Sequence, residues 1–244
     1  MKTLVIIPSR LSATRLPGKP LMKINGLSMI SHVFKKAEDA NIGKVLVATE
    51  DPEIIEDVEK NGGQAILTHN HHKTGTDRIY EALQKVNNSD IDLIMNLQGD
   101  EPLINIEDIK NLNNLMIKNN TQFGTLAAKI SDKKLYEKQS VVKVTTKEKL
   151  DFLNFQEAVN FVRKVSDFNG NIYHHLGIYC YKLETLKKFV SYNQSTNETK
   201  NNLEQLRALD NNIKINVALA KSSPMGVDTE EDLIAIKKIM EYKS

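Results

Sequence analysis

The sequence has very little cysteine and no tryptophan: Cys180 is the one cysteine among 244 residues. A single cysteine cannot form an internal disulfide bond, so the chain falls outside the class of small secreted domains held together by disulfides. A lone cysteine in an apolar run is more often a small buried side chain than a nucleophile, and we expect this of Cys180. The pattern fits a reducing compartment, and we expect a cytoplasmic protein.

Long apolar runs are also missing. The apolar run in "MKTLVIIPSR" ends at Pro8 and Arg10, which is too short for a signal peptide. No segment approaches the roughly 20 apolar residues of a membrane-spanning helix, so we expect no membrane partner. With 33 Lys and Arg against 31 Asp and Glu, the net charge of +2 gives no general attraction to nucleic acid. Any anion site must therefore be local.

Apolar runs and amphipathic segments alternate through the first hundred residues. Continuous β-branched runs such as "TLVIIPS" are typical of strands buried on both faces, and apolar residues at helical spacing indicate helices between them. Asp51, followed by Pro52, is a candidate helix cap. This alternation predicts an α/β protein with a mostly parallel central sheet and helices on both faces. The expected strands are "TLVIIPS", "GKVLVATE", "QAILT" and "DLIMNLQGD". The expected helices are "MISHVFKKAEDA", "DPEIIEDVEKNGG" and "TGTDRIYEALQKV".

The pattern loosens after residue 120, which indicates a mixed C-terminal extension of one domain, residues 1–244. We expect residues 193–202, "NQSTNETKNN", to form a mobile loop. The expected strands are "FGTLAAKI", "SVVKVTT", "LDFLNFQ", "YHHLGIYCYK" and "KINVALA", and the expected helices are "ETLKKFVSY", "NNLEQLRAL" and "DTEEDLIAIKKIMEY".

A basic loop, "RLSATRLPGKPL", follows the first expected strand. It is not a Walker A phosphate loop, because Ala13 replaces the first glycine and Pro20 follows Lys19. Ligands of open parallel sheets bind at the carboxyl ends of the strands, where this loop lies. Its Arg10, Arg15 and Lys19 suit phosphate oxygens. The alternative is a solvated basic loop.

Two acidic stretches are candidate metal sites. Asp100 in "LQGDEP" follows the fourth expected strand, and Asp228 opens "DTEEDL". Carboxylates facing a basic loop suit Mg²⁺, which takes few protein oxygens and shares substrate phosphates. A turn at Gly99–Asp100 and a helix start at Asp228 are the alternative interpretations.

The six histidines show no metal spacing. His69, His71 and His72 lack the cysteine or carboxylate set of a zinc site, so we expect none there. His174 and His175 alternate along an expected strand and should face opposite sides of it. Nothing assembles a Ser–His–Asp triad or a glycosidase pair of carboxylates.

Seven motifs in order along nearly the whole chain resemble those of the 3-deoxy-manno-octulosonate cytidylyltransferases, or CMP-Kdo synthetases. They are "IIPSRLSATRLPGKPL", "VATEDPEI", "TGTDRIYE", "NLQGDEP", "HHLGIYCY", "LEQLRAL" and "GVDTEEDL". The resemblance implies the Rossmann-like nucleotide-diphospho-sugar transferase fold and a homodimer. It also implies transfer of CMP from CTP to 3-deoxy-D-manno-octulosonate (Kdo) for lipopolysaccharide synthesis, with release of pyrophosphate and with Mg²⁺ as cofactor.

The resemblance also implies roles for individual residues. Lys19, Arg15 and Asp100 would be catalytic, and Asp100 and Asp228 would hold Mg²⁺. The nucleotide would be bound by Arg10, Arg15, Lys19, Thr74 and Arg78, and the sugar acid by Gln98, His175, Tyr179, Glu204 and Gln205.

The chain departs from the family in one stretch. Gln156 and Glu157 stand where the family has a serine and a sugar-site arginine, and Arg163 or Lys164 are candidate substitutes for that arginine. A glutamate in place of an arginine reverses a charge near an acidic substrate. This leaves three alternatives open: a modified Kdo as substrate, a sialic-type acid sugar, or a CTP-binding regulatory protein without turnover.

Overall fold

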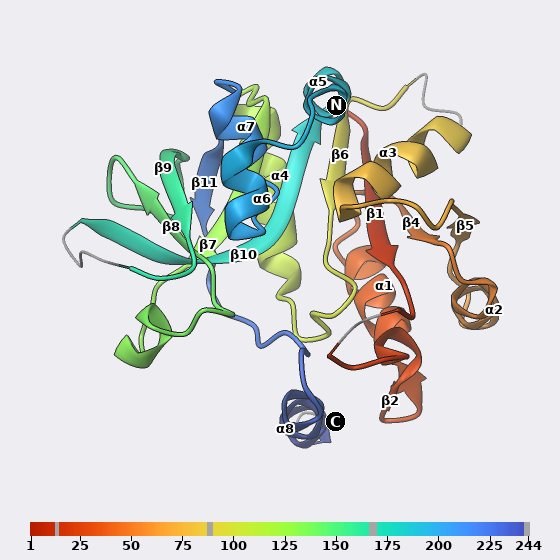
Figure 1. Ribbon diagram of the computed structural model, residues 1–244. Coiled ribbons are helices and arrows are strands. Elements are labelled where there is room, and N and C mark those ends of the chain that lie inside the picture. The colour runs from red at the N-terminus through yellow and green to blue at the C-terminus, as the bar shows by residue number, and fades with distance from the viewer. Residues whose placement is uncertain (13–14, 87–89, 166–169, 242–244) are drawn as a thin grey trace. The chain divides into compact units, whose positions relative to one another are not determined.

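The computed structural model describes residues 1–12, 15–86, 90–165 and 170–241, and the chain divides into two compact units. The first unit comprises residues 2–91, 95–106 and 224–244, and the second comprises Met1 and residues 92–94 and 107–223. Figure 1 shows the elements of both units. That the chain forms one domain over residues 1–244 stays a prediction.

Three strands of the first unit pair in parallel, as expected. β1 (Thr3–Ser9) pairs with β4 (Gly43–Thr49), and β4 pairs with β5 (Ala65–Leu67). Their buried β-branched side chains explain the continuous apolar runs in the sequence. β6 (Leu93–Asn96) is buried along its whole length and divides between the two units at Ile94.

Helices connect these strands. α1 (Met29–Asp39) and α2 (Pro52–Lys60) carry the chain from β1 through β4 to β5, and α3 (Gly75–Lys85) carries it back toward β6. Right-handed crossovers in opposite directions place helices on opposite faces of a sheet. α1 and α2 contact each other, while α3 packs on β1 and β4, so helices cover both faces as the sequence predicted.

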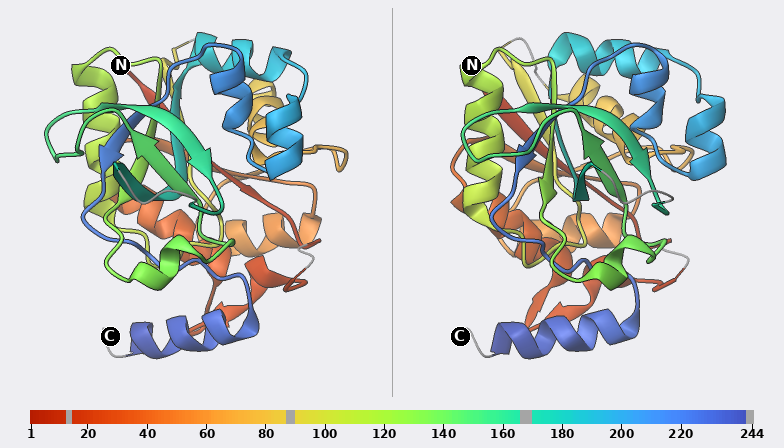
Figure 2. Two further views of the ribbon diagram at one scale, coloured as in Figure 1. Left: turned by 60° about the vertical axis from the view of Figure 1, so that its left-hand side comes forward. Right: turned by 90° about the vertical axis from the view of Figure 1, so that its left-hand side faces the viewer.

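The last helix completes a small core of the first unit. α8 (Glu230–Glu241) lies beside the hairpin of β2 (Lys23–Ile24) and β3 (Leu27–Ser28) in Figure 2, although more than 200 residues separate them. Residue 242, the end of the helix expected there, lies outside the described residues. The core consists of Ile24, Met29, Val227, Leu233 and Ile236.

The second unit contains a mixed sheet that closes on itself, because its edge strand β8 also pairs with β10. β11 runs parallel to β7, and the other pairings are antiparallel. This confirms the mixed character predicted for the later part of the chain. In order the strands are β10 (Asn171–Lys182), β7 (Phe123–Ala128), β11 (Asn216–Leu219), β9 (Gln156–Val162) and β8 (Lys143–Thr146).

A long helix between β6 and β7 was not predicted from the sequence. α4 (Ile106–Lys118) buries Ile109, Leu112 and Met116 at helical spacing, but its asparagine-rich sequence hid the pattern. The helices expected after β10 are present, although the second is shorter than "NNLEQLRAL". They are α5 (Leu183–Ser191) and α7 (Leu206–Asp210), and 3-10 turns cover Lys19–Leu21 (η1) and Lys133–Tyr136 (η2).

Two expectations were wrong. Residues 151–154 are not strand, because the carboxylate of Asp151 accepts hydrogen bonds from the backbone N–H groups of Leu153 (2.7 Å) and Asn154 (2.9 Å) and folds them into a turn. Residues 193–202 are not a loop, because α6 (Thr196–Asn201) forms there. Ser195 and Glu198 make a capping box at its start.

Cys180 is buried in β10, and burial raises the pKa of its thiol far above the usual value. This agrees with the packing role expected from the sequence. Across the described ranges, no helix is both long and apolar enough to cross a bilayer.

A buried ion pair anchors α6 to α7. Arg207 donates to both oxygens of Glu198, at 2.8 and 2.6 Å, and its guanidinium lies 4.8 Å from the centre of the Phe189 ring. Both charged side chains are almost fully buried. Burial alone would raise the pKa of Glu198, but the hydrogen bonds from Arg207 and Gln194 outweigh burial and lower it.

We predict that Glu198→Gln lowers the free energy of unfolding by about 3–5 kcal/mol at neutral pH, because Arg207 keeps a buried charge without its partner. A lowered pKa stabilises the fold above the usual value of 4.5 and loses that contribution as the pH falls. Urea unfolding at neutral and acidic pH should therefore show the two proteins converging in acid. Equal stability at neutral pH would contradict the prediction.

Candidate functional site

A pocket of about 400 Å³ lies in the first unit, at the carboxyl ends of its strands. Three loops line it: the one after β1, the one leading into α3 and the one after β6. The start of the α8 segment contributes a further residue. Eight of the residues singled out in the sequence line this pocket: Arg10, Arg15, Lys19, Thr74, Arg78, Gln98, Asp100 and Asp228.

The basic loop is held by backbone contacts. The N–H of Leu11 donates to the carboxylate of Asp51 (2.7 Å), and the N–H of Gly18 donates to the carbonyl of Leu11 (3.0 Å). Asp51 was expected to cap α2, but its side chain makes no cap hydrogen bond and holds this loop instead. Gly18 has a φ of 72°, which favours glycine, and it directs Lys19 into the pocket.

Lys19 is the centre of the pocket's charges. Its ammonium donates to Asp100 Oδ2 (2.6 Å) and to the carbonyl of Val227 (2.7 Å), and it lies 4.0 Å from Asp228 Oδ1. Arg15 donates to Asp228 Oδ1 at 2.9 Å. The basic loop and the two acidic stretches, more than 80 residues apart in sequence, therefore meet through direct ion pairs.

A buried acid lies beside this centre. The Oε2 atom of Glu101 is buried without a hydrogen-bond partner among the described residues. Burial raises the pKa of Glu101 well above its usual value, and the neighbouring charge of Asp100 raises it further.

Asp100 and Asp228 are suitable ligands for Mg²⁺, which binds one or two carboxylates and completes its shell with water and phosphate oxygens. The described part of the chain gathers no group of three or more His, Cys, Asp or Glu side chains suited to a metal. The donor set therefore fits a cation shared with a phosphate-bearing ligand better than a cation enclosed by the protein.

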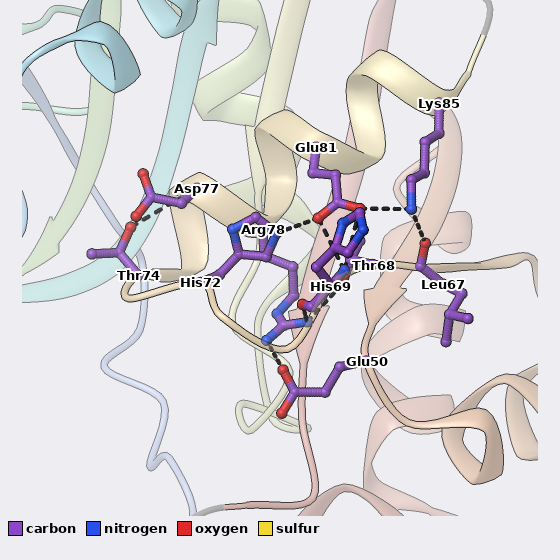
Figure 3. A network of polar contacts seen from close by, with 10 residues as sticks. All are labelled: Glu50, Leu67, Thr68, His69, His72, Thr74, Asp77, Arg78, Glu81 and Lys85. Atoms are coloured by element: carbon purple, nitrogen blue, oxygen red, sulfur yellow. Dashed lines mark hydrogen bonds and ion pairs between the residues drawn. The ribbon is translucent and has the colours of Figure 1, made fainter.

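Arg78 and Thr74 border the pocket while serving the structure of α3 (Figure 3). Arg78 is buried and donates to Glu50, to Thr68 Oγ1 (2.6 Å) and to the carbonyl of His69 (3.2 Å). Thr74 Oγ1 accepts the N–H of Asp77 (3.2 Å) and caps the helix. Their predicted contact with a nucleotide stays a prediction.

Other residues that line the pocket were not predicted from the sequence as site residues. They are close in sequence to the predicted residues. A prediction that took in every residue of each loop at a strand end would have identified them. Gly99 allows a close approach of segments, because a Cβ atom there would lie 3.3 Å from the carbonyl oxygen of Pro8. The additional lining residues are Pro8, Ser9, Leu16, Pro20, His72, Lys73, Gly75 and Gly99.

The second unit brings together another predicted group. The ring of His175 bonds Thr125 Oγ1 through Nε2 (2.9 Å), and its centre lies 5.4 Å from that of Tyr179. The hydroxyl of Tyr179 donates to Gln205 Oε1 at 3.1 Å. Glu204 is adjacent in sequence to Gln205, and its charge acts on Tyr179.

His175 and Tyr179 are uncharged at neutral pH. Burial lowers the pKa of His175 to about 3, with a smaller contribution from His174. Burial also raises the pKa of Tyr179 well above 10.0, and Glu204 adds to the shift. The group therefore offers neutral hydrogen-bonding partners. His174 bonds Ser223 instead of Thr125, which is consistent with the alternation expected along β10.

Comparisons with known proteins agree with the motifs. The family model described as "Cytidylyltransferase" matches residues 4–215. The 3-deoxy-manno-octulosonate cytidylyltransferases of Rhodopseudomonas palustris (strain BisB5) and Bartonella bacilliformis are 41% and 38% identical to this chain. The alignments cover 98% of the chain and 98% and 99% of those proteins. The chain belongs to this family.

A solved structure supports the same assignment. The chain matches CMP:2-keto-3-deoxy-manno-octonic acid synthetase complexed with CTP at a TM-score of 0.90 and 34% identity, over the full length of both chains. A UDP-glucose pyrophosphorylase complexed with UDP-glucose matches at a TM-score of 0.74 but 15% identity, which shows the fold alone. The nucleotide-sugar transferase fold implied by the motifs is thus confirmed.

The departure from the family at Glu157 has a local explanation. Glu157 pairs with Lys147 (3.0 Å) and Lys214 (3.4 Å) on the surface of the second unit, and the hydrogen bond from Lys147 is the main cause of its lowered pKa. Arg163 is not free to replace an arginine there. Its guanidinium donates to the carbonyls of Asn201 and Asn202, both at 2.8 Å.

Lys19 occupies the neighbourhood that a cation would share with Asp100 and Asp228. We predict that Lys19→Met tightens Mn²⁺ binding in the absence of nucleotide by about tenfold, or about 1.4 kcal/mol, because the competing ammonium is removed. Calorimetric or paramagnetic titration measures this affinity. Lys23→Met, at an exposed lysine of β2, is the control and should leave it unchanged. Weaker Mn²⁺ binding by Lys19→Met would contradict the competition.

Proposed function

We propose that this protein transfers CMP from CTP to the anomeric hydroxyl of Kdo, giving CMP-Kdo and pyrophosphate for lipopolysaccharide synthesis. The observation that carries the proposal is the first-unit pocket, in which three basic side chains and two carboxylates meet at strand ends. Family membership over nearly the full length supports the identity of both substrates.

The basic side chains provide the phosphate chemistry. The sugar hydroxyl loses its proton to solvent as its oxygen forms a bond to the α-phosphorus of CTP. The bond to the leaving pyrophosphate breaks, and negative charge moves onto pyrophosphate. Arg10 and Arg15 offer forked donors, and Lys19 offers a point charge. Phosphoryl-type transfer depends mainly on positioning and on charge stabilisation of this kind.

Mg²⁺ is the proposed cofactor, with Asp100 and Asp228 as its protein ligands. When bound, it would neutralise phosphate charge between these carboxylates and the nucleotide. Lys19 and Arg15 pair with the same carboxylates in the protein alone, at 2.6 and 2.9 Å. We infer that they turn toward the triphosphate once metal and nucleotide arrive together.

The proposed sugar-binding residues are uncharged side chains, two of them amides, together with the acid Glu204. His175, Tyr179 and Gln205 supply neutral donors and acceptors that suit sugar hydroxyl groups. Glu204 lies beside Gln205, and Gln98 lines the first-unit pocket. Glu157 is paired with two lysines, so its negative charge is compensated. The glutamate at this position therefore gives no reason to expect a modified sugar in place of Kdo.

We further propose a cytoplasmic homodimer. The second unit exposes apolar side chains at Phe152, Leu153 and Val159, with exposed fractions of 46%, 71% and 54%. Exposed apolar side chains of this kind are available for association with a second copy of the chain. Light scattering after size-exclusion chromatography measures the mass, and a monomer at all concentrations would contradict this part of the proposal.

The reaction is tested by measuring pyrophosphate release from CTP with Mg²⁺ present. We expect release with Kdo and none without an acceptor sugar. Amino-substituted Kdo and a nine-carbon sialic acid in parallel assays separate the related acceptors. CTP binding without release for any of these sugars would overturn the proposed activity.

We predict that Asp100→Asn lowers turnover by at least about 10²-fold, which corresponds to roughly 2.7 kcal/mol on the barrier. The amide that replaces the carboxylate carries no charge for the metal. Steady-state pyrophosphate release measures the effect, with Asp39→Asn, at an exposed acid near the end of α1, as the matched control. Activity within a few-fold of wild type would remove Asp100 from the mechanism.

A further inference from the structure

One carboxylate beside the pocket gathers four donors. Glu81 of α3 accepts from Lys85 Nζ (2.6 Å), from His69 Nδ1 (2.7 Å), from the backbone N–H of His69 (3.0 Å) and from His72 Nε2. Figure 3 shows the two histidine side chains and the lysine converging on it. The side chain of Glu81 is 12% exposed. None of the sequence motifs described above predicts these four hydrogen bonds.

The chemistry of the carboxylate fixes the two rings. An ionised carboxylate can only accept hydrogen bonds, so the nitrogen that faces it must carry a proton. His69 therefore carries its proton on Nδ1 and His72 carries its proton on Nε2. Glu81 therefore fixes which ring nitrogen of each histidine faces the carboxylate.

Hydrogen bonds keep Glu81 ionised. Burial alone would raise its pKa, but hydrogen bonds from Lys85, His72 and His69 outweigh burial and lower the pKa far below 4.5. The Glu81 carboxylate therefore remains a hydrogen-bond acceptor throughout the neutral pH range. Arg78, one turn earlier on α3, holds the same loop through Thr68 Oγ1 and the carbonyl of His69.

The braced loop forms one wall of the pocket. His72, Lys73 and Thr74 line the pocket, whereas Glu81 does not. The side chain of His72 is only 11% exposed, so its ring has little freedom beyond the orientation that Glu81 gives it. A change at Glu81 can thus reach a ligand only through this wall.

We propose that Glu81 is a positioning residue for the nucleotide, which fixes the ring and tautomer of His72 and holds residues 72–74 as a nucleotide-binding wall. The inference builds on the proposed function, in which this pocket binds CTP. Glu81 acts through His72 and touches no substrate.

The test combines kinetics with direct binding. Glu81→Ala should raise KM for CTP and the Kd for CTP from calorimetry by about tenfold, because a misplaced wall weakens ground and transition states alike. The values of kcat and of KM for Kdo should stay within about twofold. Glu81→Gln keeps one acceptor oxygen and should show a smaller effect, and it serves as the test variant if Glu81→Ala fails to fold.

Nitrogen NMR of the histidine rings supplies a readout that a general loss of stability would not move. In the wild type at about pH 8, where imidazoles are neutral, His72 should show the Nε2–H tautomer, and Glu81→Ala should give a mixture. His71→Ala and Glu184→Gln are the controls. His71 is an exposed neighbour in the loop that contacts the other rings, and Glu184 is an exposed acid paired with Lys187.

An unchanged tautomer of His72 in Glu81→Ala, or unchanged CTP affinity, would overturn the inference. So would a parallel fall in kcat and in affinity for both substrates, which would mean a general structural role. The proposed function fails separately: a wild type that binds CTP but releases no pyrophosphate with any sugar contradicts the reaction while the calorimetric and NMR tests of Glu81 still apply.

Discussion

The ion pair between Lys19 and Asp100 joins the parts of the chain on which the first-unit pocket depends. The lysine belongs to the loop after β1, the carboxylate follows β6, and the carbonyl of Val227 that shares the ammonium precedes α8. Loop closure over such sequence distances costs conformational entropy, which the apolar core around Val227 and Ile24 offsets. The charged centre is thus held by hydrophobic packing beneath it.

The two units solve different electrostatic problems. In the first, basic side chains and carboxylates pair with each other, an arrangement that an incoming anion and cation can exchange. In the second, burial keeps His175 and Tyr179 neutral, so these two side chains offer hydrogen bonds and no charge.

Residue patterns predicted the parallel strands of the first unit because a strand buried on both faces leaves a continuous apolar run, as in β1 and β4. The same patterns missed α4, where asparagine side chains interrupt the apolar stripe. They misjudged Asp51, whose position suits a helix cap but whose oxygen bonds the distant N–H of Leu11. The partners of Asp51, Glu157 and Glu81 are set by tertiary contacts, which local sequence does not contain. That the strand-end loops line a pocket was predictable, because ligands of open parallel sheets bind at the carboxyl ends of the strands. The sequence motifs in these loops then predicted which side chains would bind phosphate and metal.

Cys180 is buried in the middle of a strand, with its thiolate form strongly disfavoured. Thiol reagents attack the thiolate, so the native chain is nearly inert toward maleimides. A fluorophore coupled to one cysteine introduced at an exposed position would then report on that position alone. The natural sequence is in effect already a cysteine-free background for site-specific labelling.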